Sequence, residues 1–152
     1  MRRTILTGIA ATAAVVVLAA PAWGHASFRQ PSVPPDSDQR LVINVPVERE
    51  GQHNVKVILE VPPEFKVLGC DRKPGWGCTV TPPGNRPASL VTWNREGGAA
   101  RDNEGDDFTF GVRTPKPGRY AVEVNQKYSG GETVRWDGPE NSDNPAAFLD
   151  VR

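Results

Sequence analysis

The sequence has few of the side chains that usually carry chemistry: two histidines, two cysteines and one methionine in 152 residues. The methionine is Met1, so a soft metal site that depends on thioether ligands is hard to build. Two histidines leave no acid–base or nucleophilic constellation, and we therefore expect that the protein is not an enzyme.

Charge of a single sign is also lacking. The 18 Lys and Arg residues balance the 18 Asp and Glu residues, and no basic patch or stripe stands out in the sequence. Nucleic acid is therefore not an expected partner. After residue 24 there is no long apolar run and no stretch with helical periodicity, so we expect no transmembrane span and no helix in the mature chain.

The one apolar run lies at the N-terminus. A basic start, Met1-Arg2-Arg3, is followed by apolar or small residues from 5 to 20 and then by Pro21. This order is typical of a secretory signal peptide, and the run is shorter than the ~20 residues of a membrane span. Signal peptidase specificity alone allows cleavage after Ala22, Gly24 or Ala26. We expect an exported protein, periplasmic or extracellular.

The two cysteines lie close together in the sequence. Exported proteins meet oxidising conditions, so we expect Cys70 and Cys78 to form a disulfide around Gly75-Trp76-Gly77. A metal site built from the two thiols is the alternative, but it would need more soft ligands than these two.

The part of the chain from residue 25 to 152 has the size of one domain and the pattern of an all-β fold. After a strand-like arm within residues 25–38, we expect strands near residues 40–48, 54–61, 64–68, 76–80, 89–94, 107–113, 119–128, 132–136 and 147–151, separated by Pro- and Gly-containing turns. Eight or nine short strands of this kind predict a single Ig-like or cupredoxin-like β-sandwich.

The strand at residues 54–61 has the clearest alternation. Val55, Val57, Leu59 and Val61 fall on one face, which we expect to be buried, and Asn54 falls on the opposite face.

His25 is the candidate metal ligand. If the signal peptide is cut after Gly24, His25 becomes the first residue, and its α-amine and Nδ1 can close a chelate ring on one ion. An unperturbed α-amine has a pKa of about 7.7–8.0 and an unperturbed imidazole of about 6.5, so both can be neutral donors near neutral pH. Nitrogen donors suit copper, and we expect one Cu(II) per chain. His53 lies in a turn and is not expected to be a ligand.

Four segments follow one another in a recognisable order. They are Gly24-His25-Ala26, Val45-Pro46-Val47-Glu48-Arg49-Glu50, Pro74-Gly75-Trp76 and Val134-Arg135-Trp136-Asp137-Gly138-Pro139. In this order and spacing the chain resembles the YcnI-like family of exported bacterial copper-binding domains. The resemblance implies a signal peptide at residues 1–24, a β-sandwich at 25–152 and a Cu(II) site called a monohistidine brace, formed by His25, Glu48 and Trp136.

The residue types of the two partners agree with this role but do not establish it. Glu48 can supply an anionic oxygen to a divalent ion, and Glu50 is the alternative carboxylate if the register differs. Trp136 can offer its ring face to a cation, or it can be an ordinary core aromatic, as we expect for Trp76 and Trp93. The acidic segment at residues 102–107 lacks the spacing of a calcium loop and is expected to be a solvated turn.

The predicted function is extracytoplasmic Cu(II) binding by a monomeric carrier, metallochaperone or buffer in copper homeostasis. Its expected partners are the copper ion and another copper-trafficking protein. Two alternatives remain open on the sequence: a metal-free adhesion or protein-interaction sandwich, and a copper oxygenase that uses the N-terminal histidine. The oxygenase would require a second histidine ligand, for which only His53 is available.

Overall fold

The structure is a computed structural model that describes residues 24–152. The expected signal peptide, residues 1–24, lies outside this range apart from Gly24. The described part contains strands β1 to β11 and no helix. It consequently has no helix that is long and apolar enough to cross a membrane.

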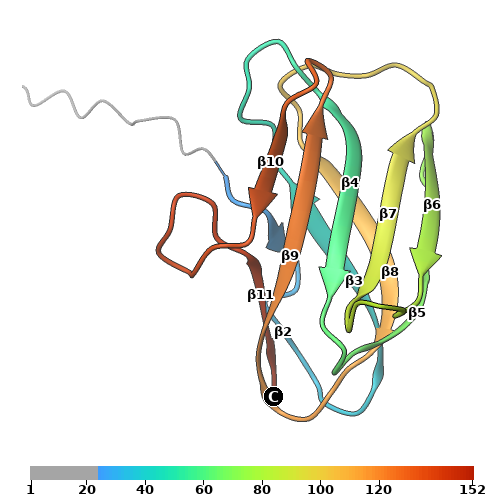
Figure 1. Ribbon diagram of the computed structural model, residues 1–152, viewed down its shortest axis with the longest axis vertical. Coiled ribbons are helices and arrows are strands. Elements are labelled where there is room, and N and C mark those ends of the chain that lie inside the picture. Colours follow the sequence, from blue (N-terminus) through green and yellow to red (C-terminus); the bar gives the residue numbers. More distant parts are fainter. Residues whose placement is uncertain (1–23) are drawn as a thin grey trace, which may run out of the picture.

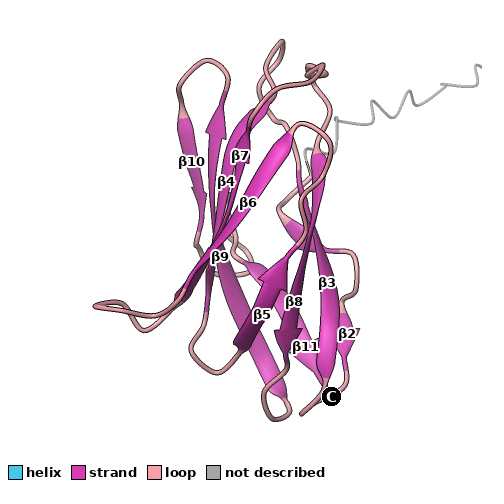
Figure 2. Cartoon of the chain, turned by 90° about the vertical axis from the view of Figure 1, so that its right-hand side faces the viewer, coloured by secondary structure: helices cyan, strands magenta, loops and turns pink. Residues whose placement is uncertain are grey.

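The strands form two sheets that pack face to face (Figures 1 and 2). One sheet has the order β1 (Ser27–Phe28), β3 (Asp38–Val45), β8 (Asp106–Arg113) and β5 (Lys66–Cys70). The other has the order β2 (Ser32–Val33), β11 (Ala147–Val151), β9 (Gly118–Tyr128), β4 (Asn54–Val61), β7 (Ser89–Arg95) and β6 (Trp76–Thr81), and β10 (Thr133–Trp136) pairs with β9. The prediction of a single all-β sandwich is confirmed.

The core is built from residues that alternate along the strands and face the opposite sheet. On β8, Phe108, Phe110 and Val112 are all buried. The ring of Phe108 lies 5.0 Å from that of Trp93 and 4.9 Å, edge-on, from that of Trp76, measured between centroids. Both tryptophans are core aromatics, as predicted, and such tilted or edge-on pairs add to the gain from burial.

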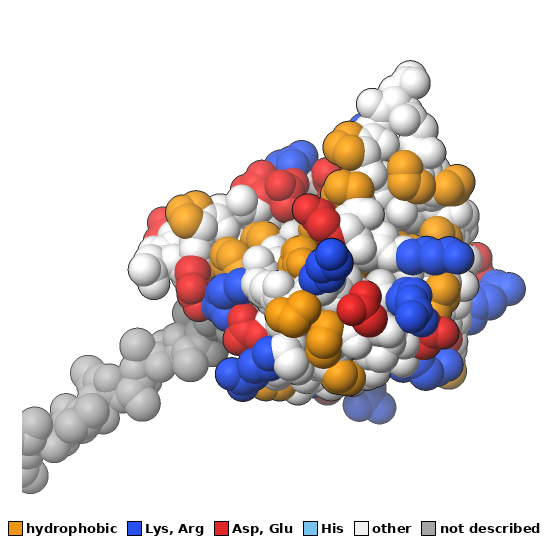
Figure 3. Space-filling model, turned by 90° about the horizontal axis from the view of Figure 1, so that it is seen from below, with side chains coloured by type: hydrophobic (Ala, Val, Ile, Leu, Met, Phe, Trp, Pro, Cys, Tyr) orange, Lys and Arg blue, Asp and Glu red, His pale blue; other side chains and the backbone are white. Residues whose placement is uncertain are grey.

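Acidic and basic side chains are interspersed at the end of the molecule where the C-terminus lies (Figure 3). Ion pairs tie neighbouring strands there: Arg113 to Asp38 at 3.1 Å, and Arg119 to Asp150 at 2.7 Å. These pairs are partly exposed, and pairs of this kind add little to stability.

Some strand bounds differ from the expectation for identifiable reasons. The arm contains two additional short strands, β1 and β2, and β5 begins at Lys66 rather than near residue 64. The expected strand at 40–48 was wrong at its end, because β3 stops at Val45. Pro46 has no N–H to continue the ladder, so Glu48 leaves the sheet and lies in an irregular segment.

The predicted facing of Asn54 was also wrong. The pairing of β4 with β9 shifts register between Asn54 and Lys56. Such a bulge turns the preceding residues to the other face of the strand. Asn54 is therefore fully buried, whereas Val55 is only half-buried.

A sandwich of two open sheets has two seams where the edge strands face each other. At one seam lie β5 and β6, the last strands of their sheets. The disulfide Cys70–Cys78 joins them, with 6.2 Å between the Cα atoms. The predicted disulfide is thus confirmed, and it leaves no thiol for the alternative metal site.

At the other seam, β1 faces a divided edge. The strand β9 pairs with β11 along its first half and with β10 along its second half, so β10 is an edge strand. No disulfide closes this seam, and it is here that the predicted site residues lie.

We expect the double substitution Cys70→Ala, Cys78→Ala to lower the free energy of unfolding by about 2–3 kcal/mol, because the bridge restricts the unfolded chain through a short loop. Urea denaturation of the oxidised protein and the variant measures this difference. An unchanged midpoint would mean that the bridge does not hold the β5–β6 seam together.

Candidate metal centre

The arm that carries His25 is anchored immediately after it. Ala26 and Phe28 are buried, at 2% and 8% exposure, while His25 is exposed. The β1 ladder pairs Ser27 with Asn44 on β3, and the N–H of Arg29 donates to the carbonyl of Val42 at 2.8 Å. The backbone position of His25 is therefore fixed by the core although its side chain faces solvent.

Two further side chains hold the arm on the outer edge of β3. The Gln30 amide donates to the carbonyl of Arg40 at 3.1 Å and accepts from the N–H of Val42 at 3.0 Å. The guanidinium of Arg29 binds the carboxylate of Asp107 at 2.9 to 3.2 Å through two nitrogens. Side chains thus extend the pairing that the two-residue strand β1 begins.

His25 and Trp136 lie next to each other across the open seam. Their ring centroids are 6.0 Å apart, with the planes inclined by 55°. Trp136 is the last residue of β10, is fully buried and pairs with Val124 on β9. Trp136 is therefore both a core aromatic and a wall beside His25.

Glu48 lies on the segment that leaves β3 toward this seam. A Cβ placed on Gly24 would be 3.8 Å from the Cβ of Pro46, so the start of the arm lies against the end of β3. Glu48 is two residues further along the chain, at most about 7 Å from Pro46 between Cα atoms. It is half-buried, and its N–H donates to the Tyr128 hydroxyl at 3.2 Å. Glu50, the alternative carboxylate, is exposed.

The segment around Glu48 is also held by its neighbour Arg49. Two guanidinium nitrogens of Arg49 bind Glu132 at 2.8 and 2.9 Å, and the guanidinium lies 5.7 Å from the ring centroid of Tyr128. The hydrogen bond from Arg49 lowers the pKa of the Glu132 carboxyl. Burial raises the pKa of the Tyr128 hydroxyl, which therefore stays protonated near neutral pH.

Beneath these residues lies a buried amide that the sequence reading missed. The indole N–H of Trp136 donates to Gln126 Oε1 at 2.8 Å, and Gln126 Nε2 donates to the carbonyl of Pro46 at 2.5 Å. Gln126 occupies an inward position of β9, in phase with Val122 and Val124. A polar residue at an apolar phase was the signal that could have identified it.

The second histidine lies elsewhere. His53 Nδ1 is 2.8 Å from Asp102 Oδ1. The backbone N–H of His53 donates to the hydroxyl of Ser129, the residue after the end of β9. Trp136 pairs with Val124, further back along that strand. The imidazole of His53 thus lies against Asp102, whereas that of His25 lies beside Trp136.

The carboxylates of the acidic segment each bind a different partner instead of converging. Asp106 binds Lys73, Asp107 binds Arg29, and Asp102 contacts His53. Within residues 24–152 no group of three or more His, Cys, Asp or Glu side chains is arranged to hold a metal ion. The brace expected from the sequence would need fewer side chains, because the α-amine of His25 would be one of its ligands.

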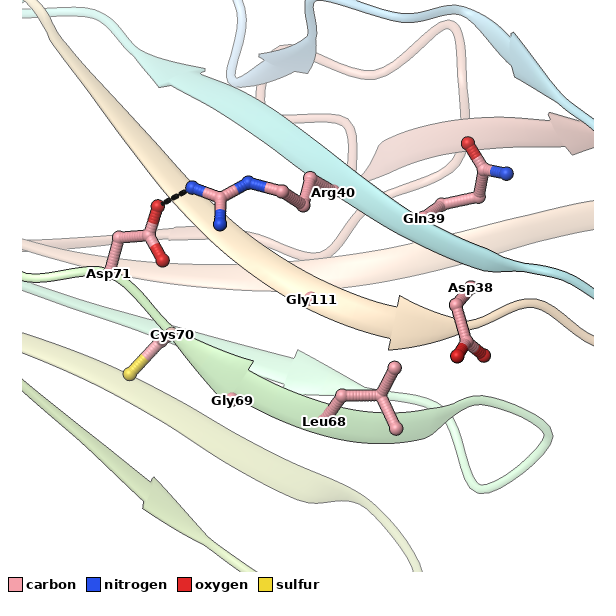
Figure 4. A pocket seen from close by; sticks show the side chains of 8 residues that line it. All are labelled: Asp38, Gln39, Arg40, Leu68, Gly69, Cys70, Asp71 and Gly111. Carbon is pink, nitrogen blue, oxygen red and sulfur yellow. Dashed lines mark hydrogen bonds and ion pairs between the residues drawn. The ribbon is translucent and has the colours of Figure 1, made fainter.

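A separate hollow of about 370 Å³ lies on the outer face of the four-stranded sheet (Figure 4). Gly69 and Gly111 are cross-strand partners there, and the lack of two side chains opens the space. Leu68 borders it at 49% exposure, and Arg40 forms an ion pair with Asp71 along its rim. The residues of the candidate metal centre do not line this hollow.

Comparison with known proteins identifies a family and a fold. The family model described as "Domain of unknown function (DUF1775)" matches residues 25–151. An uncharacterised protein from Nocardia farcinica, whose crystal structure is described as an immunoglobulin-like fold, is 21% identical, with a TM-score of 0.72 over 84% of this chain and 97% of that chain. No curated protein matches the sequence.

More distant solved structures have the same type of sandwich. A cohesin module from a Clostridium perfringens family 33 glycoside hydrolase is 11% identical, with a TM-score of 0.57 over 85% of this chain and 95% of that chain. A chain of the Coh-OlpA-Doc918 complex, described as a type I cohesin–dockerin complex from Clostridium thermocellum, is 9% identical, with a TM-score of 0.52 over 84% of this chain and 98% of that chain. At these identities the likeness shows the fold alone.

The Tyr128 hydroxyl can be removed without changing the ring that fills the core. We expect Tyr128→Phe to cost about 1 kcal/mol of unfolding free energy and to speed hydrogen exchange at the Glu48 amide. Tyr120→Phe is the matched control, because the hydroxyl of Tyr120 donates to the carbonyl of Lys116. If both variants leave Glu48 exchange unchanged, the hydroxyl of Tyr128 does not hold this segment.

The Arg49–Glu132 pair gives a pH dependence. Because the folded state lowers the pKa of Glu132, the pair stabilises the protein above the usual range of a glutamate, about pH 4.3, and this contribution disappears as the pH falls through the folded value. We expect Glu132→Gln to lose less stability than the wild type between pH 6 and pH 3, measured by urea denaturation. Glu64→Gln, at an exposed glutamate, is the control and should follow the wild type.

Proposed function

This chain belongs to the DUF1775 family, and we propose that after export it binds one Cu(II) ion through His25 as its first residue. The observation that carries the proposal is the contact of His25 with the buried ring of Trp136, 6.0 Å apart in the open seam between β1 and β10. An exposed imidazole on a fixed backbone, beside an aromatic wall, is the arrangement that a monohistidine brace requires. The resemblance to YcnI-like copper-binding domains supports the same assignment.

The proposed ligands match the preferences of Cu(II). The α-amine and Nδ1 of His25 would supply two nitrogens from one residue, and the carboxylate of Glu48 would supply an anionic oxygen. Because the chelate comes from a single residue, it needs no cluster of histidines. Trp136 would border the ion with its ring, where a cation gains from the negative face of the indole.

We propose a carrier or buffer rather than a catalyst. The side chain of His25 faces solvent, so a partner could approach the ion and offer competing ligands. An oxygenase of the kind considered above would add a second histidine to the brace, and His53 contacts Asp102 instead. The proposed setting is the periplasm or cell exterior, the proposed state is a monomer, and the proposed partner is a copper-trafficking protein that exchanges the ion.

The test is a competition titration with Cu(II) on protein that begins at His25. We expect one ion per chain. We expect His25→Ala, or one extra residue before His25, to weaken binding by more than the about 10–100-fold that loss of an outer-shell partner costs, since each removes part of the chelate itself. Glu48→Gln should weaken it by about tenfold or more. His53→Ala is the matched control and should bind like the wild type. If His25→Ala binds like the wild type, the proposed site is wrong.

A further inference from the structure

A continuous chain of hydrogen bonds runs through the core behind the proposed copper site. The indole N–H of Trp136 donates to Gln126 Oε1 at 2.8 Å. Gln126 Nε2 donates to Asn54 Oδ1 at 2.7 Å, and Asn54 Nδ2 donates to Asp106 Oδ2 at 3.1 Å. The other oxygen of Asp106 accepts from Lys73 at 3.0 Å. Trp136, Gln126 and Asn54 are all fully buried.

The direction of every bond in this chain follows from the chemistry of its ends. The indole can only donate and the carboxylate of Asp106, paired with Lys73, can only accept. The second hydrogen of the Asn54 amide goes to the carbonyl of Val45 at 3.1 Å, and that of the Gln126 amide goes to the carbonyl of Pro46 at 2.5 Å. Both amides are therefore held in one orientation, and a flip of either would place donor against donor.

This series of hydrogen bonds joins the separate pieces of the site. Val45 is the last residue of β3, and Pro46 begins the segment that leads on to Glu48. Trp136 is the end of β10, in the opposite sheet, and Gly24 lies against Pro46. One pair of buried amides thus fixes the wall beside His25 and the origin of the segment that carries Glu48.

We propose that Gln126 and Asn54 are positioning residues for copper binding. Asp106, at the other end of the series of hydrogen bonds, sets the orientation of their amides. The inference rests on the proposed function. Because the indole N–H is committed to Gln126, Trp136 cannot turn its nitrogen toward the ion and presents only ring carbons to it. The site is held in its binding geometry before the ion arrives, so disturbing the amides weakens binding although neither amide reaches the ion.

The first experiment needs no metal. In the apo protein beginning at His25, we expect Asp106→Asn to shift the indole N–H resonance of Trp136 and to speed its exchange with solvent by about tenfold, because an amide at position 106 sets a donor against Asn54 or Lys73. The indole N–H of Trp93 is the internal reference, since it donates to the carbonyl of Asp71 at 2.9 Å. Asp150→Asn, in the ion pair with Arg119, is the matched control and should leave Trp136 unchanged.

The second experiment is Cu(II) titration with electron paramagnetic resonance of the bound ion. We expect Gln126→Leu to weaken binding by about 10–100-fold and to change the spectrum, as loss of a supporting hydrogen bond does at metal sites. Asp106→Asn should act in the same direction, and it carries the test if Gln126→Leu does not fold. Val112→Ala, which opens the core on β8, controls for loss of stability alone and should bind like the wild type.

The outcomes separate the two proposals. If the wild type binds one copper ion and both Gln126→Leu and Asp106→Asn retain its affinity and spectrum, the positioning role is overturned while the proposed function stands. The same holds if Val112→Ala weakens binding as much as Gln126→Leu at equal loss of stability. If the wild type itself binds no copper, the proposed function fails and the positioning role fails with it.

Discussion

The hydrogen bond between the indole of Trp136 and the amide of Gln126 is the interaction on which the candidate site depends. A tryptophan at the end of an edge strand would otherwise bury an unpaired N–H or turn outward to solvent. Gln126 accepts that N–H inside the sandwich, and its own amide nitrogen donates to the carbonyl of Pro46, which directly follows β3 of the other sheet. The ring of Trp136 is consequently held at the seam, with the ring of His25 beside it.

The two seams of the sandwich are closed by different means. The disulfide Cys70–Cys78 joins β5 to β6 covalently. On the opposite side, β1 is only two residues long, and side-chain amides, a hydroxyl and an ion pair replace the missing ladder. Polar side chains therefore lie at this seam, whereas a covalent bond closes the other one.

Much of the fold could be predicted because strand residues alternate with a period of two. The alternation within residues 54–61 placed Val57, Leu59 and Val61 on the buried face, and Pro and Gly marked the turns. The bulge at Asn54 was not readable, because a register shift depends on the partner strand. The same limit applies to the site. The residue types suggested His25, and the family resemblance supplied Glu48 and Trp136. The buried amides of Gln126 and Asn54 could not be placed, because that requires knowing which strands face each other. Gln126 was the exception that could have been noticed, as a polar residue in an apolar phase.

We propose that the mature protein begins with His25 and uses that residue to hold copper. The most direct measurement is a native mass spectrum of the protein as its host exports it, before and after addition of one equivalent of Cu(II). We predict the mass of residues 25–152 with an intact disulfide, and a gain of one copper ion. The mass of a chain that begins at Trp23 or Ser27 would contradict the proposal, because in either case His25 would not supply the terminal amine.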